Sequence, residues 1–207
     1  YKRQGLHYFS HDLDNQWHSI RNKFHNTASD SIYEPEIFGD TSAYADVYRV
    51  KPKEIAFYFQ DKMEFDDMVI NIGARYDQFD PESIFPSDRR NPANQLILPD
   101  SMTSNYPQAP VIEQISPRVG FAYQLGNQAV LHFSYGHFFQ MPPMYAMYQN
   151  HSFLVDPNDF VTRMGNTLLE PEKTITYELG LWQELSRQAS LDVALFYRDI
   201  YLSLIHI

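Results

Sequence analysis

The stretch Lys53–Phe79, KEIAFYFQDKMEFDDMVINIGARYDQF, alternates apolar and polar side chains on either side of a short acidic turn. Ile55, Phe57 and Phe59 fall on one face of an extended strand, because successive side chains of a strand point to opposite faces. The second half of the stretch resumes this alternation after the turn. The pattern predicts two long antiparallel strands joined as a β-hairpin.

The same unit recurs, and three hairpins are predicted at residues 53–79, 115–139 and 174–201. Their tight turns all fall at one end, and long polar segments fall at the other. These segments are predicted to be external loops and cover residues 11–50, 80–113 and 140–172. Strands of about ten residues with short turns on one rim and long loops on the other are typical of an outer-membrane β-barrel. The sequence therefore predicts an all-β, antiparallel up-and-down transmembrane β-barrel segment of six strands, or seven if residues 5–10 form one.

Composition narrows the possible functions. The chain has 207 residues, no cysteine and a formal net charge of -10. The lack of cysteine excludes disulfides and thiolate metal sites, and the acidic balance argues against a nucleic-acid partner. No apolar run approaches the roughly 18 residues that mark a transmembrane helix, and no secretory signal is recognisable. Motifs of serine hydrolases, zinc proteases and phosphate-binding loops are missing, so we expect no enzymatic activity and no bound cofactor.

Two other kinds of protein share parts of this pattern. The strands of a soluble extracellular β-rich domain, with a binding or structural role, would also alternate apolar and polar residues. Sandwich strands usually have only about five or six residues, however, and nothing requires every tight turn to lie at one end. A passive porin-like channel would show the same strands and the same difference between its two rims. Both alternatives remain open at this point.

Three segments resemble motifs of the TonB-dependent outer-membrane receptors. FYFQDK at residues 57–62, followed by MVINIGARYDQF at 68–79, resembles the YxQD and GxRYD hairpin of that family. ISPRVGFAYQL at 115–125 resembles its SPRxG strand, and the segment 165–200 is similar to its NPxLxPE and YExG region. The motifs occur in the order of the family and together cover most of the chain.

The resemblance implies a barrel of about 22 strands in the outer membrane of a Gram-negative bacterium, filled by an N-terminal plug. No plug sequence is recognisable, so we expect residues 1–207 to be a partial barrel domain from the middle or later part of such a receptor. The implied function is active uptake of a scarce nutrient, such as a ferric siderophore, cobalamin or an oligosaccharide. The implied partners are outer-membrane lipid, the TonB complex through the plug, and an extracellular small-molecule or oligosaccharide ligand.

Several charged side chains fall on the polar face of the predicted strands, which would face the barrel lumen. Charges inside a large barrel can pair with one another or with a plug, and this keeps them out of hydrocarbon. We therefore interpret them mainly as structural. They are Arg75, Asp77, Arg118, Glu178, Asp192 and Arg198.

Ligand selectivity is expected in the long loops, because binding residues are often carried on loops that a rigid scaffold positions. The candidates for substrate contact are arginine and tyrosine side chains of these loops, together with one arginine of the lumen. They are Arg89, Arg90, Tyr106, Tyr145, Tyr148 and Arg118.

Three methionines in the last long loop raise the question of a metal site. Met141, Met144 and Met147 are spaced by three, so one helical turn could present their thioethers to a soft metal such as Cu(I). Pro142 and Pro143 fit the first turn of a short helix, and the simpler interpretation is an apolar underside of a loop segment. The histidines show no convincing ligand spacing, and no metal site is predicted.

Overall fold

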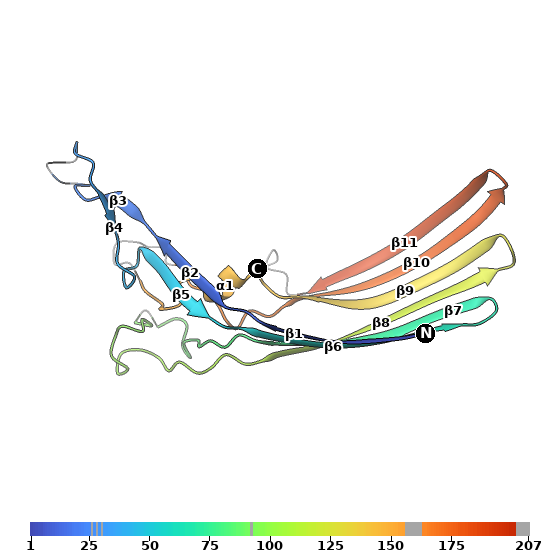
Figure 1. The fold of residues 1–207 in the computed structure, drawn as a ribbon, viewed down its shortest axis with the longest axis horizontal. Coiled ribbons are helices and arrows are strands. Elements are labelled where there is room, and N and C mark those ends of the chain that lie inside the picture. The colour runs from blue at the N-terminus through green and yellow to red at the C-terminus, as the bar shows by residue number, and fades with distance from the viewer. Residues whose placement is uncertain (26, 28, 30, 92, 156–162, 202–207) are drawn as a thin grey trace.

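The computed structural model describes residues 1–25, 27, 29, 31–91, 93–155 and 163–201. Its main feature is a seven-stranded antiparallel sheet with the order β1-β6-β7-β8-β9-β10-β11, which curves into a trough (Figure 1). The strands are β1 Lys2–Ser10, β6 Lys53–Glu64, β7 Met68–Asp80, β8 Ile112–Leu125, β9 Ala129–Gln140, β10 Glu172–Ser186 and β11 Ala189–Tyr201. This up-and-down sheet confirms the fold class that the alternation predicts.

The two ends of the sheet differ as the sequence predicts. Three tight turns join β6 to β7, β8 to β9 and β10 to β11 at one end, and the long connections lie at the other (Figure 1). Two backbone hydrogen bonds between Phe65 and Met68 close the first turn. Gly126 begins the second turn with a φ of 64°, a left-handed conformation that glycine adopts without the steric penalty of a side chain. The short turns therefore have local causes in the sequence.

The segment predicted as the loop 11–50 contains more regular structure than expected. It forms a two-stranded arm from β2 (Leu13–His18) and β5 (Ala45–Val50), extended by β3 (Ile20–Asn22) and β4 (Pro35–Ile37). The Asn15 side-chain amide donates to the Asp46 carbonyl oxygen over 2.7 Å. These strands are only 3 to 6 residues long, so their alternation is too brief to show in the sequence.

The long connections share a small hydrophobic core above the loop end of the sheet. Val50 of the arm, Phe79 of β7, and Met147 and Tyr148 of the helix α1 (Met144–Tyr148) are all buried in it. The sequence predicts Pro142 and Pro143 in the first turn of a short helix, and the structure places Pro143 one position earlier, at the N-cap. Met147 is 1% exposed and its side chain therefore fills this core. Among the described residues, no group of three or more His, Cys, Asp or Glu side chains could hold a metal ion.

The two faces of the sheet carry different side chains. Tyr58 lines the hollow of the trough, and its neighbour Phe57 lies on the opposite face because side chains alternate along β6. Tyr135, Tyr177 and Tyr197 form a cross-strand row on that opposite face, with ring centroids 5.0 and 6.2 Å apart. Such a row suits the aromatic girdle of a barrel at a membrane interface. None of the described helical residues belongs to a helix long and apolar enough to cross a membrane.

Candidate functional site on the inner face of the sheet

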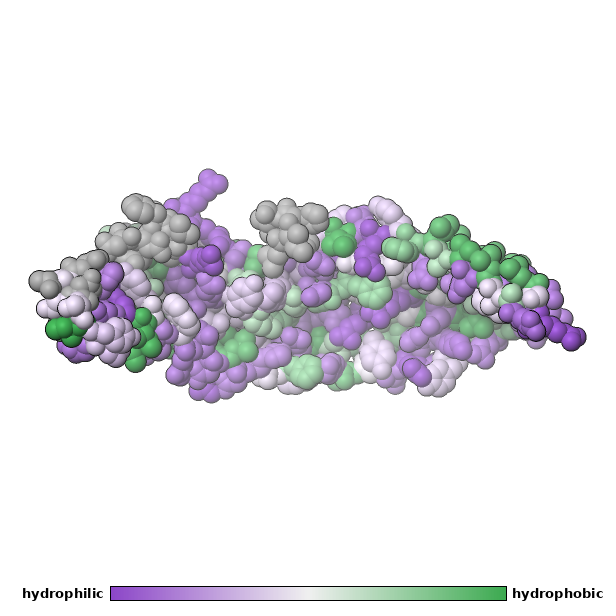
Figure 2. Space-filling view, turned by 90° about the horizontal axis from the view of Figure 1, so that it is seen from above, coloured by the Kyte–Doolittle hydropathy of each residue, from purple (hydrophilic) through white to green (hydrophobic). Residues whose placement is uncertain are grey.

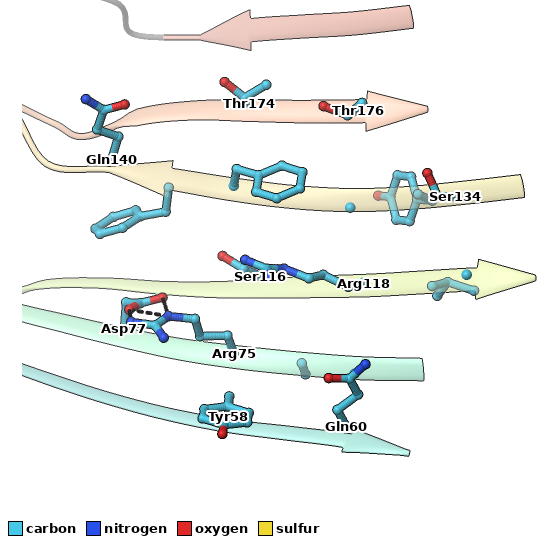
Figure 3. A pocket seen from close by; sticks show the side chains of 18 of the residues that line it. Tyr58, Gln60, Arg75, Asp77, Ser116, Arg118, Ser134, Gln140, Thr174 and Thr176 are labelled. Atoms are coloured by element: carbon cyan, nitrogen blue, oxygen red, sulfur yellow. Dashed lines mark hydrogen bonds and ion pairs between the residues drawn. The ribbon is translucent and has the colours of Figure 1, made fainter. Parts of the chain in front are cut away.

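The inner face of the trough holds a hollow with a volume of about 1380 Å³. Six strands, β6 to β11, line it. Each strand directs every second side chain to this face, and the residues between contribute mainly backbone. Figure 3 shows Gln60, Ser116, Ser134, Thr174 and Thr176 on neighbouring strands of this wall. In the space-filling view from above, hydrophilic side chains are spread through the middle of the molecule (Figure 2). The wall therefore offers hydrogen-bonding groups over a broad surface.

A charge pair and an amide pair are fixed on this wall. The Arg75 guanidinium donates from Nε to both carboxylate oxygens of Asp77, over 2.8 and 2.9 Å (Figure 3). The two residues are two positions apart on β7, so they share a face. The Gln60 side-chain amide donates to Asn71 Oδ1 over 2.7 Å, which links β6 to β7. These contacts confirm that the structure pairs part of the inner-face polar groups with one another.

Two further carboxylates of the inner face contact histidines. Glu54 Oε1 lies 3.1 Å from His11 Nε2, near the loop end of the sheet. Glu178 Oε1 lies 3.6 Å from His132 Nε2, nearer the turns. The imidazole of His132 lies directly over the backbone of Gly180, its register partner on β10, where a side chain would collide with the ring. Gly180 therefore gives the imidazole the space from which it reaches Glu178.

Arg118 lies in the middle of the wall without an acidic partner among the described residues. Its guanidinium carbon is 4.8 Å from the ring centroid of Phe138 on β9. In the register of the sheet, Arg118 has glycine on both sides, Gly73 on β7 and Gly136 on β9. A Cβ at position 136 would lie 3.3 Å from the Phe138 ring and 3.6 Å from Arg118 Cγ. The glycine thus leaves room for the arginine to stack on the phenyl ring.

The long connections β7–β8 and β9–β10 are tied together above this wall. Thr167 Oγ1 donates to the Ile84 carbonyl oxygen over 3.2 Å. The rings of Tyr106 and Phe153 stack, with centroids 5.7 Å apart and planes 19° apart. Arg89 lines a small cavity of about 30 Å³ between the two connections. The described parts of these loops therefore form one interlocked cluster.

A family model described as TonB dependent receptor-like, beta-barrel, matches residues 2–201. The chain belongs to this family. A search of curated proteins finds no match. The match covers nearly the whole chain and agrees with the resemblance of its strand motifs to receptors of this family.

Two solved receptor structures are similar to the chain. One is the alcaligin outer-membrane receptor FauA from Bordetella pertussis, with 19% identity and a TM-score of 0.43 over 96% of this chain and 26% of that one. The other is the ferric-catecholate import receptor Fiu from E. coli K12 in its closed form, with 16% identity and a TM-score of 0.50 over 96% of this chain and 28% of that one. The chain thus spans about a quarter of the length of each receptor. At this identity, the second likeness supports the fold of a TonB-dependent barrel wall and nothing finer.

The predicted ligand residues of this receptor lie in two separate places. Arg118 lines the inner hollow, and the other five lie in the loop cluster or on its surface. Tyr145 is 66% exposed, whereas Tyr148 is 1% exposed and its ring belongs to the loop core. Tyr106 is half-buried against Phe153, and Arg90 is exposed. Of the two helix tyrosines, the structure leaves only Tyr145 accessible to a ligand.

The hollow also contains residues that the sequence did not single out for binding. Phe138, Thr176 and Arg198 line it together with Arg118. Alternation alone places Arg198 on the lumen face, but it does not show that these side chains come together. Their proximity depends on the register between β8, β9, β10 and β11. The tight turns fix the register of β8 with β9 and of β10 with β11. A long connection joins β9 to β10, so the sequence does not fix the register across all four strands.

Where the arm meets α1, two titratable groups have shifted pKa values. The backbone N–H of Asn150 donates to Asp46 Oδ1 over 3.0 Å and joins the arm to the segment that follows the helix. Burial raises the pKa of the Asp46 carboxyl, and the hydrogen bond from Asn150 opposes this shift. Burial lowers the pKa of His151, and the negative charge of Asp46 opposes that shift. Both groups lie beyond the loop end of the sheet, where the arm contacts the β9–β10 connection.

Proposed function

We propose that this chain forms part of the barrel wall of a receptor that imports a scarce nutrient across the Gram-negative outer membrane with energy from the TonB complex. The observation that carries the proposal is the difference between the two ends of the sheet. Three tight turns lie at one end, and interlocked loops stand above a polar inner hollow at the other. Such loops can meet a solute outside the cell, and the polar wall can guide it inward.

Three classes of nutrient fit this proposal: a ferric siderophore, cobalamin and an oligosaccharide. Each is too large for simple diffusion through a narrow pore, and each offers oxygen atoms to the amide, hydroxyl and guanidinium groups of the hollow. The proposed partners are outer-membrane lipid on the Phe57 face, the ligand on the Tyr58 face, and the TonB complex through a plug domain of the parent receptor. The loop cluster would provide the first contact with the ligand.

Growth of the native bacterium tests the function. The gene that encodes the full-length receptor is deleted, and growth is measured under iron limitation, with cobalamin as the limiting vitamin, and with oligosaccharides as the carbon source. We expect the deletion to impair growth in one of the three conditions, and the intact gene to restore growth. In a strain that already lacks TonB, the deletion should cause no further impairment. Uptake that persists without TonB would identify a passive channel. Recovery of the protein in the soluble fraction would identify a soluble binding domain.

A further inference from the structure

We propose that the arm acts as a latch on the β9–β10 connection: Asp46 of the arm holds residues 150–153 in a strained backbone conformation, and release of the arm lets them relax. The device goes beyond the proposed uptake function and holds for any imported solute. Every contact in it joins two described residues of this chain, so it does not depend on other parts of the parent receptor.

Two residues shortly after α1 have left-handed backbone conformations. The φ angle is 50° at Asn150 and 55° at Phe153. Asparagine adopts this conformation at little cost, but a bulky residue such as phenylalanine is strained in it, because its Cβ comes too close to the following carbonyl oxygen. Such strain persists only where the surrounding structure imposes it. The backbone of Phe153 is therefore expected to change when its surroundings loosen.

The β7–β8 connection holds one side of this strained turn. Phe153 is 5% exposed, and its ring stacks on Tyr106 with centroids 5.7 Å apart. The next residue, Leu154, is buried to the same extent. On the same side, the Leu96 N–H donates to the Ser152 carbonyl oxygen over 3.2 Å. Packing and a hydrogen bond thus fix the turn against this connection.

Asn150 joins the other side of the turn to the arm. Its backbone N–H donates to Asp46 Oδ1 over 3.0 Å. Its side-chain Oδ1 accepts from the Leu154 N–H over 2.9 Å, and its carbonyl oxygen accepts from the Phe153 N–H over 2.9 Å. The same residue therefore binds the arm and closes the turn that contains Phe153.

Asp46 is fixed within the arm and moves with it. It pairs with Trp17 across the two strands, and its carbonyl oxygen accepts from the Asn15 side-chain amide over 2.7 Å. Val50, at the base of the arm, is buried in the loop core. The arm can therefore pivot at its base and withdraw Asp46 from the β9–β10 connection.

Withdrawal of Asp46 has a defined consequence for the turn. The Asn150 N–H loses its acceptor on the arm, and relaxation of the Phe153 backbone draws the ring off Tyr106. Movement of the arm thus reaches the β7–β8 connection through a continuous series of contacts. Because such coupling is reciprocal, a displacement of the β7–β8 connection also loosens the arm.

Amide hydrogen exchange in the full-length receptor, purified in detergent, tests the latch. The reporters are the amides of Leu154 in the turn and Leu96 in the β7–β8 connection. We expect Asp46→Ala to speed the exchange of both amides about tenfold, as for the loss of a hydrogen bond to a charged group, and Asp46→Asn, which keeps an oxygen acceptor, to speed it much less. The control is Asp14→Ala, which removes an equal charge from an exposed position on the same arm. Equal exchange at Leu96 in Asp46→Ala and Asp14→Ala overturns the latch.

Two substitutions at position 153 test the strain itself. Phe153→Ala and Phe153→Gly both remove the ring, but only glycine adopts a left-handed backbone without a steric penalty. We therefore expect the Leu154 amide to exchange about threefold more slowly in Phe153→Gly than in Phe153→Ala. At a position with an ordinary backbone the order is reversed, because glycine loses more conformational freedom than alanine. Slower exchange in Phe153→Ala therefore overturns the strained conformation.

Spin labels at Glu36 of β4 and Tyr145 of α1, which are both exposed, measure the position of the arm. Any cysteine elsewhere in the receptor is first replaced by serine. We expect one narrow distribution of distances in the native receptor and a broader one, extending to longer distances, in Asp46→Ala. An unchanged distribution in that variant shows that the arm stays in place without Asp46, and it rejects the latch.

Discussion

The hydroxyl of Tyr148 donates a 2.9 Å hydrogen bond to the carbonyl oxygen of Pro81, which lies 67 positions earlier in the chain. The bond joins the helix of the β9–β10 connection to the start of the β7–β8 connection. The Tyr148 ring is buried beside Phe79 and Met147. One side chain thus connects the two long connections through both its ring and its hydroxyl.

Removing the Tyr148 hydroxyl is expected to loosen the loop cluster. Tyr148→Phe leaves the Pro81 carbonyl without its donor and should cost about 1 kcal/mol of local stability. Tyr148→Ala should cost about 3 to 5 kcal/mol, because it also leaves a cavity in the core. Amide hydrogen exchange of residues 144–151 in the full-length receptor measures both effects. Tyr145→Ala is the control, since Tyr145 is 66% exposed. Equal exchange in all variants would contradict a structural role for Tyr148.

The assignment of the two faces predicts which side chains touch lipid. Phe57 and Tyr58 are adjacent on β6, and the Tyr58 side chain lines the inner hollow. Single cysteines at the two positions can carry the same fluorophore, because residues 1–207 contain no cysteine and any cysteine elsewhere in the receptor is first replaced by serine. In the full-length receptor in brominated lipid, we expect quenching at position 57 and little at position 58. The reverse result would show that the faces are exchanged.

Gly180 is expected to be intolerant of any side chain, and Gly120 provides a matched comparison. A Cβ at position 180 would meet the far end of the His132 side chain, so the imidazole has to rotate away and leave Glu178. At position 120 the nearest atom to a Cβ is Asn71 Cβ at 3.6 Å, which is an ordinary contact. We expect Gly180→Ala to lower the stability of the full-length receptor by about 1 to 3 kcal/mol and Gly120→Ala to change it little. Thermal unfolding in detergent measures the difference, and adding His132→Ala should remove most of the loss at position 180.

Sequence patterns predict the strands well and their mutual contacts poorly. The alternation of Phe57 and Tyr58 is a local property, so the sequence is enough to place them on opposite faces. The stacking of Arg118 on Phe138 joins two strands and depends on their register, which alternation does not contain. Sequence patterns predict contacts in the loops even less well than contacts between strands. The sequence gives equal reason to expect a ligand contact at Tyr145 and at Tyr148. Only the folded structure shows that Tyr145 is exposed and Tyr148 is buried.

The short strands of the arm show a second limit. Leu13 and Val50 pair at its base, but β2 has only 6 residues, two of which are amides. A run this short and polar is similar to a loop in composition. Its strand character comes from pairing with β5, a segment more than 25 residues away in the sequence. Tertiary pairing therefore decides a structure that local preference leaves open.

The contact of the arm with the β9–β10 loop is expected to weaken in mild acid. Burial holds the pKa of His151 below its ordinary value of about 6.5, so the docked state binds fewer protons than the undocked state. The stability that His151 contributes to the docked state is fully present when the pH is above the ordinary pKa of histidine. It is lost as the pH falls through the lowered pKa of His151. Asp46 acts in the opposite sense at lower pH, because its raised pKa lets the docked state take up a proton as the pH falls through it. Between pH 7.5 and about 6, the histidine should dominate.

Hydrogen exchange of residues 144–151, corrected for the intrinsic effect of pH, tests this expectation in the full-length receptor. The groups that face His151 are Asp46 and Tyr48 on β5 and Arg89 on the β7–β8 connection. Native protein should lose protection as the pH falls, and His151→Phe should remove most of that dependence because its ring cannot take up a proton. Asp46→Asn keeps an oxygen acceptor for the Asn150 amide but removes the charge that favours His151 protonation. Asp46→Asn should therefore lose exchange protection more steeply as the pH falls. If the dependence of protection on pH is unchanged in both variants, another group controls the contact.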